Sequence, residues 1–222
     1  MGGSLPQVST FAGPIDSLYN VILIVTGVAF VLVEGILIVF LLRYRRRPGQ
    51  KAAYVHGSRQ IELAWTVGTG FMLFLLAIYQ YRSWIDAKLN LPDESQAQVV
   101  RVSSNQFEWN AIYPGADRQL DTADDIKAPI NVLHFPLDRP VVIHLESVDV
   151  LHSFFVPALR IKQDAVPGRP GRLWFQATQA GEYEVACAEL CGLGHYRMRA
   201  FVTIEPQAEF ETWLAEVAAR QQ

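Results

Sequence analysis

Two long apolar stretches constrain the fold of this chain more than any other feature. Residues 21–42 read VILIVTGVAFVLVEGILIVFLL, which is 22 positions with one charged residue, Glu34. Residues 61–79, IELAWTVGTGFMLFLLAIY, form the second stretch, with Glu62 near its start. A helix needs about 20 apolar residues to cross the hydrocarbon core of a bilayer. The sequence therefore predicts two transmembrane helices joined as a hairpin.

The segment between the two stretches predicts how the hairpin is oriented. It reads RYRRRPGQKAAYVHGSRQ and contains six basic residues and no acidic residue. Short loops rich in lysine and arginine stay on the cytoplasmic side of a membrane. We therefore expect both termini, and everything after the second helix, on the extracytoplasmic side of a bacterial-type plasma membrane or its mitochondrial inner-membrane equivalent. Residues 1–20 hold no lysine or arginine, unlike the start of a signal peptide.

The two acidic residues of the hairpin suggest different roles. Glu34 lies near the middle of its stretch, where a lone carboxylate is costly and usually faces a protein interior. Because two helices have little interior of their own, the hairpin is expected to have a protein partner in the membrane besides the surrounding lipid. Glu62 lies near the cytoplasmic surface, where it is either solvated or a candidate for proton uptake.

Charge divides the chain into two parts. Residues 1–82 carry a net charge of +4 and residues 83–222 a net charge of −7, which together give the −3 of the whole chain. We expect a transmembrane hairpin domain over 1–82 and an extracytoplasmic domain over 83–222. The acidic balance of the second part argues against nucleic acid as a partner and favours a basic protein partner.

The second part has the pattern of a β-sandwich. From about Gln98 onward, short runs with strand-like alternation are separated by turn residues, and about seven strands are predicted over roughly 110 residues, typical of an antiparallel sandwich. The final stretch, PQAEFETWLAEVAARQ, places apolar residues at helical spacing and predicts a C-terminal amphipathic helix. The clearest strand runs are QVVRVSS, QFEWNAIY, PVVIHLES, RLWFQAT, GEYEVA and MRAFVTI.

Two cysteines, Cys187 and Cys191, lie in the stretch ACAELCGLGHYRM and admit three interpretations. A local disulfide is compatible with an extracytoplasmic domain, where disulfides persist. A redox dithiol of the thioredoxin type needs a C-x-x-C motif, but three residues separate these cysteines. The third interpretation is a metal site, because His195 and Met198 follow closely.

Copper is the metal that these residue types favour. Thiolate, thioether and imidazole are its soft ligands, and a blue-copper site takes one cysteine, two histidines and a weak methionine. The second cysteine departs from that pattern and predicts two coppers bridged by both thiolates. Such a pair would share one unpaired electron and leave no open position for substrate, so the site would carry electrons. The predicted side-chain ligands are His152, Cys187, Cys191, His195 and Met198, with one backbone carbonyl completing the set.

Over nearly its whole length the chain resembles subunit II of the haem–copper cytochrome c oxidases. The resemblance is carried by the hairpin, the strand-rich domain, DVLHSFFVPALRIKQDAVPGR and CAELCGLGHYRM. It implies a cupredoxin-like Greek-key sandwich that holds a binuclear CuA centre. In that family pattern Cys187 and Cys191 bridge the coppers, His152 and Met198 complete one copper, and His195 and the carbonyl of Glu189 complete the other.

The same resemblance implies contacts with other oxidase subunits. The carboxylate of Glu189 would point toward a magnesium ion shared with subunit I, opposite to its carbonyl. Lys162, Asp164 and Arg169, in KQDAVPGR, would lie at the interface with subunit I, between CuA and haem.

Members of this family receive electrons from cytochrome c near an aromatic cluster, which here corresponds to NQFEWNAIY. Phe107 stands where the first tryptophan of the family motif is usual, and Trp109 stands where the second is. Both could equally be buried sandwich aromatics. Asp149 fits an acidic docking surface for a basic cytochrome, although it could also hydrogen-bond within its own loop.

The resemblance implies an electron-relay subunit of a terminal oxidase, with oxygen reduction and proton translocation in subunit I and no catalytic residue on this chain. The donor would be a cytochrome c or a cytochrome c-type protein, either separate or another subunit, since the chain has no C-x-x-C-H motif for a covalently bound haem. Two alternatives stay open at the sequence level. One is the equivalent subunit of a CuA-type nitric oxide reductase, and the other is a non-enzymatic, membrane-anchored copper carrier.

Overall fold

The computed structural model describes residues 5–221. The chain divides into two compact units. One unit is Asp16–Arg82, and the other joins the residues up to Ile15 with the chain from Ser83 onward. We describe each unit by itself.

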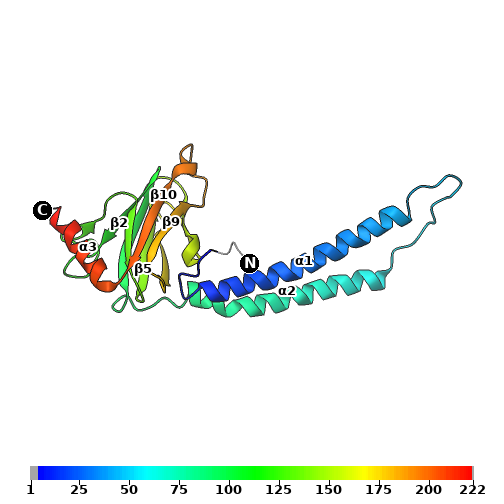
Figure 1. Cartoon of the computed structure of the whole chain (residues 1–222), viewed down its shortest axis with the longest axis horizontal. Helices are drawn as coiled ribbons and strands as arrows, with labels where there is room; N and C mark the ends of the chain where they lie inside the picture. The colour runs from blue at the N-terminus through cyan, green and yellow to red at the C-terminus, as the bar shows by residue number, and fades with distance from the viewer. Residues whose placement is uncertain (1–4, 222) are drawn as a thin grey trace. The chain divides into compact units, whose positions relative to one another are not determined.

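The first unit contains most of two long helices, α1 (Ala12–Arg43) and α2 (Arg59–Lys88), drawn in Figure 1. The hydroxyls of Ser17 and Tyr79 lie 3.2 Å apart across the pair. Both helices are long and apolar enough to cross a membrane, and most of their apolar side chains are exposed. Both also extend beyond the predicted stretches 21–42 and 61–79, because flanking residues continue the backbone hydrogen bonds whether or not they are apolar.

The second unit is a sandwich of two five-stranded sheets (Figure 1). The first sheet has the order β3-β2-β1-β5-β8, and the second has the order β4-β10-β9-β6-β7. The strands are β1 (Gln98–Asn105), β2 (Glu108–Tyr113), β3 (Ile126–Lys127), β4 (Val132–Pro136), β5 (Pro140–Ser147), β6 (His152–Val156), β7 (Ile161–Ala165), β8 (Gly171–Gln176), β9 (Gly181–Cys187) and β10 (Arg199–Glu205).

The core of the sandwich consists of large side chains from both sheets. Trp109, Phe135, Phe154 and Phe175 are completely buried, and they come from β2, β4, β6 and β8. Burying an aromatic side chain contributes roughly 1.5–3 kcal/mol relative to leaving it exposed. The core therefore fixes the positions of the strands from whose ends the candidate site is built.

The predicted architecture of hairpin, β-sandwich and C-terminal helix is confirmed, but the details of the sheets differ. The sequence predicted about seven antiparallel strands, whereas residues 5–221 form ten, and β1/β5 and β10/β4 pair in parallel. Strands β3, β4 and β7 were missed because they have five residues or fewer, too few for a clear alternation. Their places are set by partners distant in sequence.

The C-terminal helix α3 (Gln207–Ala219) packs against the sandwich, as its amphipathic pattern predicted. Phe210 and Val217 are buried, and the ring of Trp213 stacks on His134 at a centroid distance of 3.9 Å. The imidazole of His134 is also 2.7 Å from the carboxylate of Glu205. These contacts explain why an otherwise exposed terminal helix is ordered.

A short segment before α1 belongs to the sandwich unit, which the sequence did not predict. Ser9 forms a β-bridge with Ala177, and the N–H of Thr178 donates to the carbonyl of Val8 at 2.8 Å. Val8 is completely buried and Phe11 nearly so. The division into a transmembrane hairpin domain at 1–82 and an extracytoplasmic domain at 83–222 stays a prediction.

Candidate metal centre

The candidate site is built where strands β6 and β9 end. These strands pair antiparallel, with Phe154 opposite Cys187, so that His152 begins β6 close to the cysteine that ends β9. A loop then leads through Cys191 to the short 3-10 helix η2 (His195–Arg197). The backbone N–H of Cys187 donates to the carbonyl of Met198 at 3.1 Å, which closes the loop.

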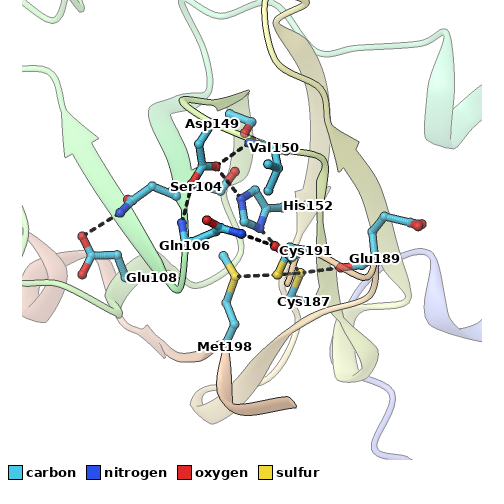
Figure 2. Close-up of polar contacts among 12 residues, drawn as sticks. Ser104, Gln106, Glu108, Asp149, Val150, His152, Cys187, Glu189, Cys191 and Met198 are labelled. Carbon is cyan, nitrogen blue, oxygen red and sulfur yellow. Dashed lines mark hydrogen bonds and ion pairs between the residues drawn. The ribbon is translucent and has the colours of Figure 1, made fainter. Parts of the chain in front are cut away.

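Six donor groups converge around this loop, and Figure 2 shows five of them, from His152, Cys187, Glu189, Cys191 and Met198. The two cysteine sulfurs lie 3.8 Å apart, far beyond the roughly 2.05 Å of a disulfide bond, and both cysteines are free. Around Cys187 Sγ lie Nδ1 of His152 at 3.9 Å and the carbonyl oxygen of Glu189 at 3.2 Å. Around Cys191 Sγ lie Nδ1 of His195 at 3.6 Å and Sδ of Met198 at 3.7 Å.

The site is nearly closed to solvent. His152 is completely buried, Met198, Cys191 and Cys187 are all less than a tenth exposed, and His195 is half-buried. Burial, and then the neighbouring Cys187, raise the pKa of Cys191 to about 11. Without a metal its thiol therefore keeps its proton at neutral pH. A metal ion must displace that proton, so metal binding is expected to strengthen as pH rises.

The donors fit copper better than a hard cation. Thiolate, thioether and imidazole are soft or borderline ligands, whereas calcium and magnesium need several oxygen ligands. Figure 2 shows the carbonyl of Glu189 directed at the cysteines and its carboxylate directed away from them. The donor atoms of His152, Cys187 and Cys191 all lie within 4.8 Å of one another. These residues form a candidate copper site.

Asp149 lies beside this site and is bonded to it. Its Oδ1 is 2.8 Å from Nε2 of His152, and its carboxylate also accepts the backbone N–H groups of Gln106 at 2.8 Å and Val150 at 2.6 Å. Partial burial works to raise the pKa of Asp149, but these hydrogen bonds outweigh it and hold the pKa below its ordinary value. The carboxylate favours a proton on Nε2, which leaves Nδ1 of His152 free to face Cys187.

The turn between β1 and β2 holds the cysteine loop from the other side. The side-chain amide of Gln106 donates to the carbonyl of Cys191. The ring of Phe107 lies so close to Gly194 that an added Cβ would come within 2.4 Å of it. The guanidinium of Arg197 is 6.0 Å from the centre of the same ring. Phe107, which is partly exposed, therefore contacts the loop directly.

Trp109 occupies a different position from Phe107. It is completely buried, and its ring packs edge-to-face on Phe154 at 5.3 Å and on His152 at 6.2 Å. Trp109 is therefore a core aromatic behind a candidate ligand, and Phe107 is the aromatic of the predicted pair that reaches the surface.

Of the residues predicted at a subunit interface, Lys162 and Asp164 form an ion pair at 3.0 Å on strand β7, with both side chains nearly half exposed. Asp164 also accepts the hydroxyl of Ser153, the residue after His152, at 2.7 Å. This hydrogen bond first, and Lys162 second, lower the pKa of Asp164. Arg169 is exposed in the following turn. Glu62 lies in the first turn of α2, in the helical unit.

Gln106, Ser153 and Gly194 complete the surroundings of the site, and sequence reasoning missed all three. Gln106 is 85 residues from its partner Cys191, a separation that no local pattern reveals. The pair of glycines at 192 and 194 was a usable signal, because a loop that needs two glycines in three positions is closely approached by something.

Fold and site together define a class of protein, a membrane-anchored β-sandwich with a candidate copper site in a loop between two strands. Two family models match the chain: "Cytochrome C oxidase subunit II, transmembrane domain" over residues 6–82 and "Cytochrome C oxidase subunit II, periplasmic domain" over residues 79–205. The chain belongs to the cytochrome c oxidase subunit II family. It is therefore a subunit of an oxidoreductase complex, anchored in a membrane, with its sandwich domain outside the cytoplasm.

Individual relatives extend over almost the whole chain. The alternative cytochrome c oxidase subunit 2 of Bradyrhizobium diazoefficiens is 31% identical, over 94% of this chain and 82% of the relative. Cytochrome c oxidase subunit 2 of Synechocystis sp. is 28% identical, over 93% and 73%. Among solved structures, the periplasmic domain of subunit II of cytochrome oxidase from Bradyrhizobium japonicum matches with a TM-score of 0.49 and 23% identity, covering 59% of this chain and 98% of that one.

Proposed function

We propose that this chain receives single electrons from a cytochrome c at a binuclear CuA centre and passes them to haem in subunit I. The observation that carries the proposal is the pair of free cysteine sulfurs, 3.8 Å apart, around which four further donors converge. A bound copper pair would supply one-electron redox chemistry, with the unpaired electron shared through the bridging sulfurs.

The chain's own residues would hold the two metals in a fixed cage. Both cysteines would bridge, as their central position among the other donors suggests. His152 and Met198 would complete one copper, and His195 and the carbonyl of Glu189 the other. Every donor lies on a strand end or a loop closed by backbone hydrogen bonds, so ligand positions would change little between redox states.

The surroundings of the cage support a relay and not a catalyst. The completely buried His152 and the nearly buried Met198 exclude water from the sulfurs. The carboxylate of Asp149 holds a proton on Nε2 of His152 and thereby orients the ring. With six donors for two metals, no position is left open for substrate. These features do not favour the copper-carrier alternative, because a carrier needs exchangeable, partly open ligand sets.

We further propose that both termini lie outside the cytoplasm, with 1–82 as the anchor and 83–222 as the CuA domain of a bacterial-type plasma membrane protein. The basic residues between the helices support this orientation. Glu34, in the middle of the first span, would face subunit I, and Glu62, at the cytoplasmic end of the second, is proposed for proton uptake.

Two surfaces of the sandwich unit are proposed as partner sites. Phe107, partly exposed and in contact with the cysteine loop, would be the aromatic nearest to the bound cytochrome, and the net charge of −7 on 83–222 would attract a basic donor. Lys162, Asp164 and Arg169 would face subunit I. The carboxylate of Glu189, directed away from the sulfurs, would reach a magnesium ion shared with that subunit.

Rapid mixing of the purified complex with reduced cytochrome c tests this proposal. Absorbance of the copper centre should change first and haem reduction should follow, with oxygen consumed at the steady state. The variant Cys191→Ser should lose the early phase and most haem reduction by cytochrome c, while a small reductant still reduces the haem. Haem reduction by cytochrome c at the normal rate in that variant would refute the relay. An assay with nitric oxide as acceptor distinguishes a reductase of that gas from an oxidase.

A further inference from the structure

The middle of the cysteine loop, residues 189–194, has few attachments to the rest of the sandwich. In the described part of the chain, its backbone makes one hydrogen bond to a residue outside 187–198. The donor is the side-chain amide of Gln106, and the acceptor is the carbonyl of Cys191. The two leucines of the segment are 77% and 98% exposed, so they do not anchor it in the core. The position of this segment therefore depends strongly on Gln106.

The glycines of the segment support this contact independently of the hydrogen bond. A Cβ added at Gly192 would lie 2.6 Å from the amide nitrogen of Gln106, and the φ of Gly192 is 135°, which favours glycine. The ring of Phe107 approaches Gly194 just as closely. The turn between β1 and β2 thus packs directly on the backbone of the cysteine loop, at two positions where only glycine leaves room for it.

The backbone of Gln106 is itself held in place. Its N–H donates to the carboxylate of Asp149 at 2.8 Å, and the same carboxylate lies 2.8 Å from Nε2 of His152 (Figure 2). Within the turn, the side-chain amide of Asn105 donates to the carboxylate of Glu108 at 3.2 Å. Gln106 therefore lies between two parts of the ligand set, with the histidine that begins β6 on one side and the cysteine loop on the other.

We propose that Gln106 is a positioning residue that couples His152 to Cys191, so that both are in place before copper binds. This inference rests on the proposed copper centre. Gln106 acts through other residues, since its side chain holds the cysteine loop and its backbone is held by the carboxylate that orients the imidazole. A loop that is ordered in advance loses less conformational entropy when it binds a ligand. Without the amide, the loop should open more often and copper should bind less tightly.

Alkylation of the copper-free, full-length chain tests the positioning step without a metal. Cys191 is 4% exposed, so it should react slowly with iodoacetamide while the loop is held. In Gln106→Leu it should react roughly 3- to 10-fold faster, which corresponds to the net contribution of one hydrogen bond. Gln179→Leu, which replaces an exposed glutamine between β8 and β9, is the matched control and should react at the unmodified rate. Gln106 is also exposed, so the Tm of the sandwich should stay the same.

The copper-loaded chain gives two further measurements. In competition with a chelator, Gln106→Leu should bind copper roughly 10-fold more weakly than the unmodified chain, as is typical when a residue that orients a ligand is lost. Its electron paramagnetic resonance spectrum should shift from seven hyperfine lines toward four, because the cysteine loop carries the Glu189 carbonyl to one copper only and its displacement makes the two coppers unequal. A residue needed only for the stability of the sandwich would leave that pattern unchanged.

A double-mutant cycle tests the coupling. Asp149→Asn should already loosen the backbone of Gln106, so adding Gln106→Leu should cost less than it does alone. The combined loss of copper affinity should fall short of the product of the single losses by roughly fivefold. Losses that simply multiply would refute the coupling.

The positioning role itself would be refuted if Gln106→Leu behaved like Gln179→Leu in both alkylation and copper affinity. An unmodified chain that binds one copper with a four-line spectrum would instead refute the proposed function. The alkylation measurement needs no metal, so it tests the hold of Gln106 on the loop in either case, and the two failures are distinguishable.

Discussion

Met198 is the proposed ligand that we expect to contribute least to holding copper in the site. Its sulfur is 3.7 Å from Cys191 Sγ, and its side chain is almost completely buried. A thioether is a weak ligand that tunes a copper site more than it holds the metal. The strong donors around it are the two cysteines and the two histidines.

We therefore predict that Met198→Leu keeps both coppers and shifts the redox potential. Leucine conserves the volume of methionine, so the packing cost should be below about 1.5 kcal/mol. Copper content per chain and a spectroelectrochemical titration measure the two effects. Loss of one or both coppers would show that the thioether is needed to retain the metal.

Asp149 separates two roles that the sequence left open, docking and internal hydrogen bonding. Its bonds to His152, Gln106 and Val150 use both carboxylate oxygens, although a third of the side chain is still exposed. If it positions His152, Asp149→Asn should lower the affinity for copper by roughly 10- to 100-fold. Competition with a copper chelator measures this. Glu182→Gln, exposed on β9, should leave the affinity unchanged. A variant that changes only the KM for cytochrome c would identify Asp149 as a docking residue.

The candidate donor residues could be predicted from the sequence, whereas the residues that hold the donor loop in place could not. Cys187, Cys191, His195 and Met198 are close in sequence, and the loop brings them together with His152. The support from Gln106 arises from packing of the β1–β2 turn on the loop, a contact across 85 residues. Such contacts depend on the sandwich being formed, and residue type alone does not indicate them.

The segment before α1 forms part of the core of the sandwich unit, which the sequence did not predict. Ser9 and its neighbours bridge to Ala177, the Ser9 hydroxyl donates to the carbonyl of Leu159 at 2.6 Å, and Val8 is completely buried. The segment is short and mixes apolar with polar residues, so no strand pattern marks it. A domain that starts at Ser83 would lack this part of its core.

Val8→Ala should destabilise the sandwich of the full-length chain. Removing two methylene equivalents from the core costs about 2 kcal/mol, which corresponds to a drop of roughly 5 °C in Tm for a domain of this size. Near-ultraviolet circular dichroism of the buried aromatics follows the transition. Val55→Ala, exposed in the loop between the helices, is the control and should not change Tm. Equal Tm values for both variants would mean that the segment contributes nothing to the stability of the sandwich.

The strands, too, could be predicted only in part from the sequence. Runs such as PVVIHLES and MRAFVTI were predicted because they alternate over seven or eight residues. Val142 is nevertheless buried, although it alternates with the buried residues Val141 and Ile143 and therefore points to the opposite face of β5. Periodicity indicates one buried face, and whether the other face is also covered depends on which parts of the chain pack over it.

For the whole molecule, the distribution of charge along the chain predicts both membrane orientation and partner charge. The chain from residue 83 onward has a net charge of −7 and the first 82 residues have +4. The basic residues between the helices predict orientation in the membrane, and the acidic second part predicts attraction of a basic electron donor. Neither depends on the details of the fold, which is why the sequence alone suggests both.

Turnover of the complex with cytochrome c should fall as ionic strength rises from about 10 to 300 mM, because screening shortens the range of the attraction that brings the donor to the acidic domain. Turnover with a small uncharged reductant should change little and serves as the control. If the rate with cytochrome c does not respond to salt, docking does not depend on the acidic surface.

The central claim is that the two cysteines bridge a pair of coppers, and the electron paramagnetic resonance spectrum of the copper-loaded, full-length chain tests it most directly. An electron shared equally by two copper nuclei of spin 3/2 gives seven hyperfine lines, whereas an electron on one copper gives four. The account predicts a purple protein with two coppers per chain and the seven-line pattern. A blue protein with one copper and a four-line pattern would contradict it.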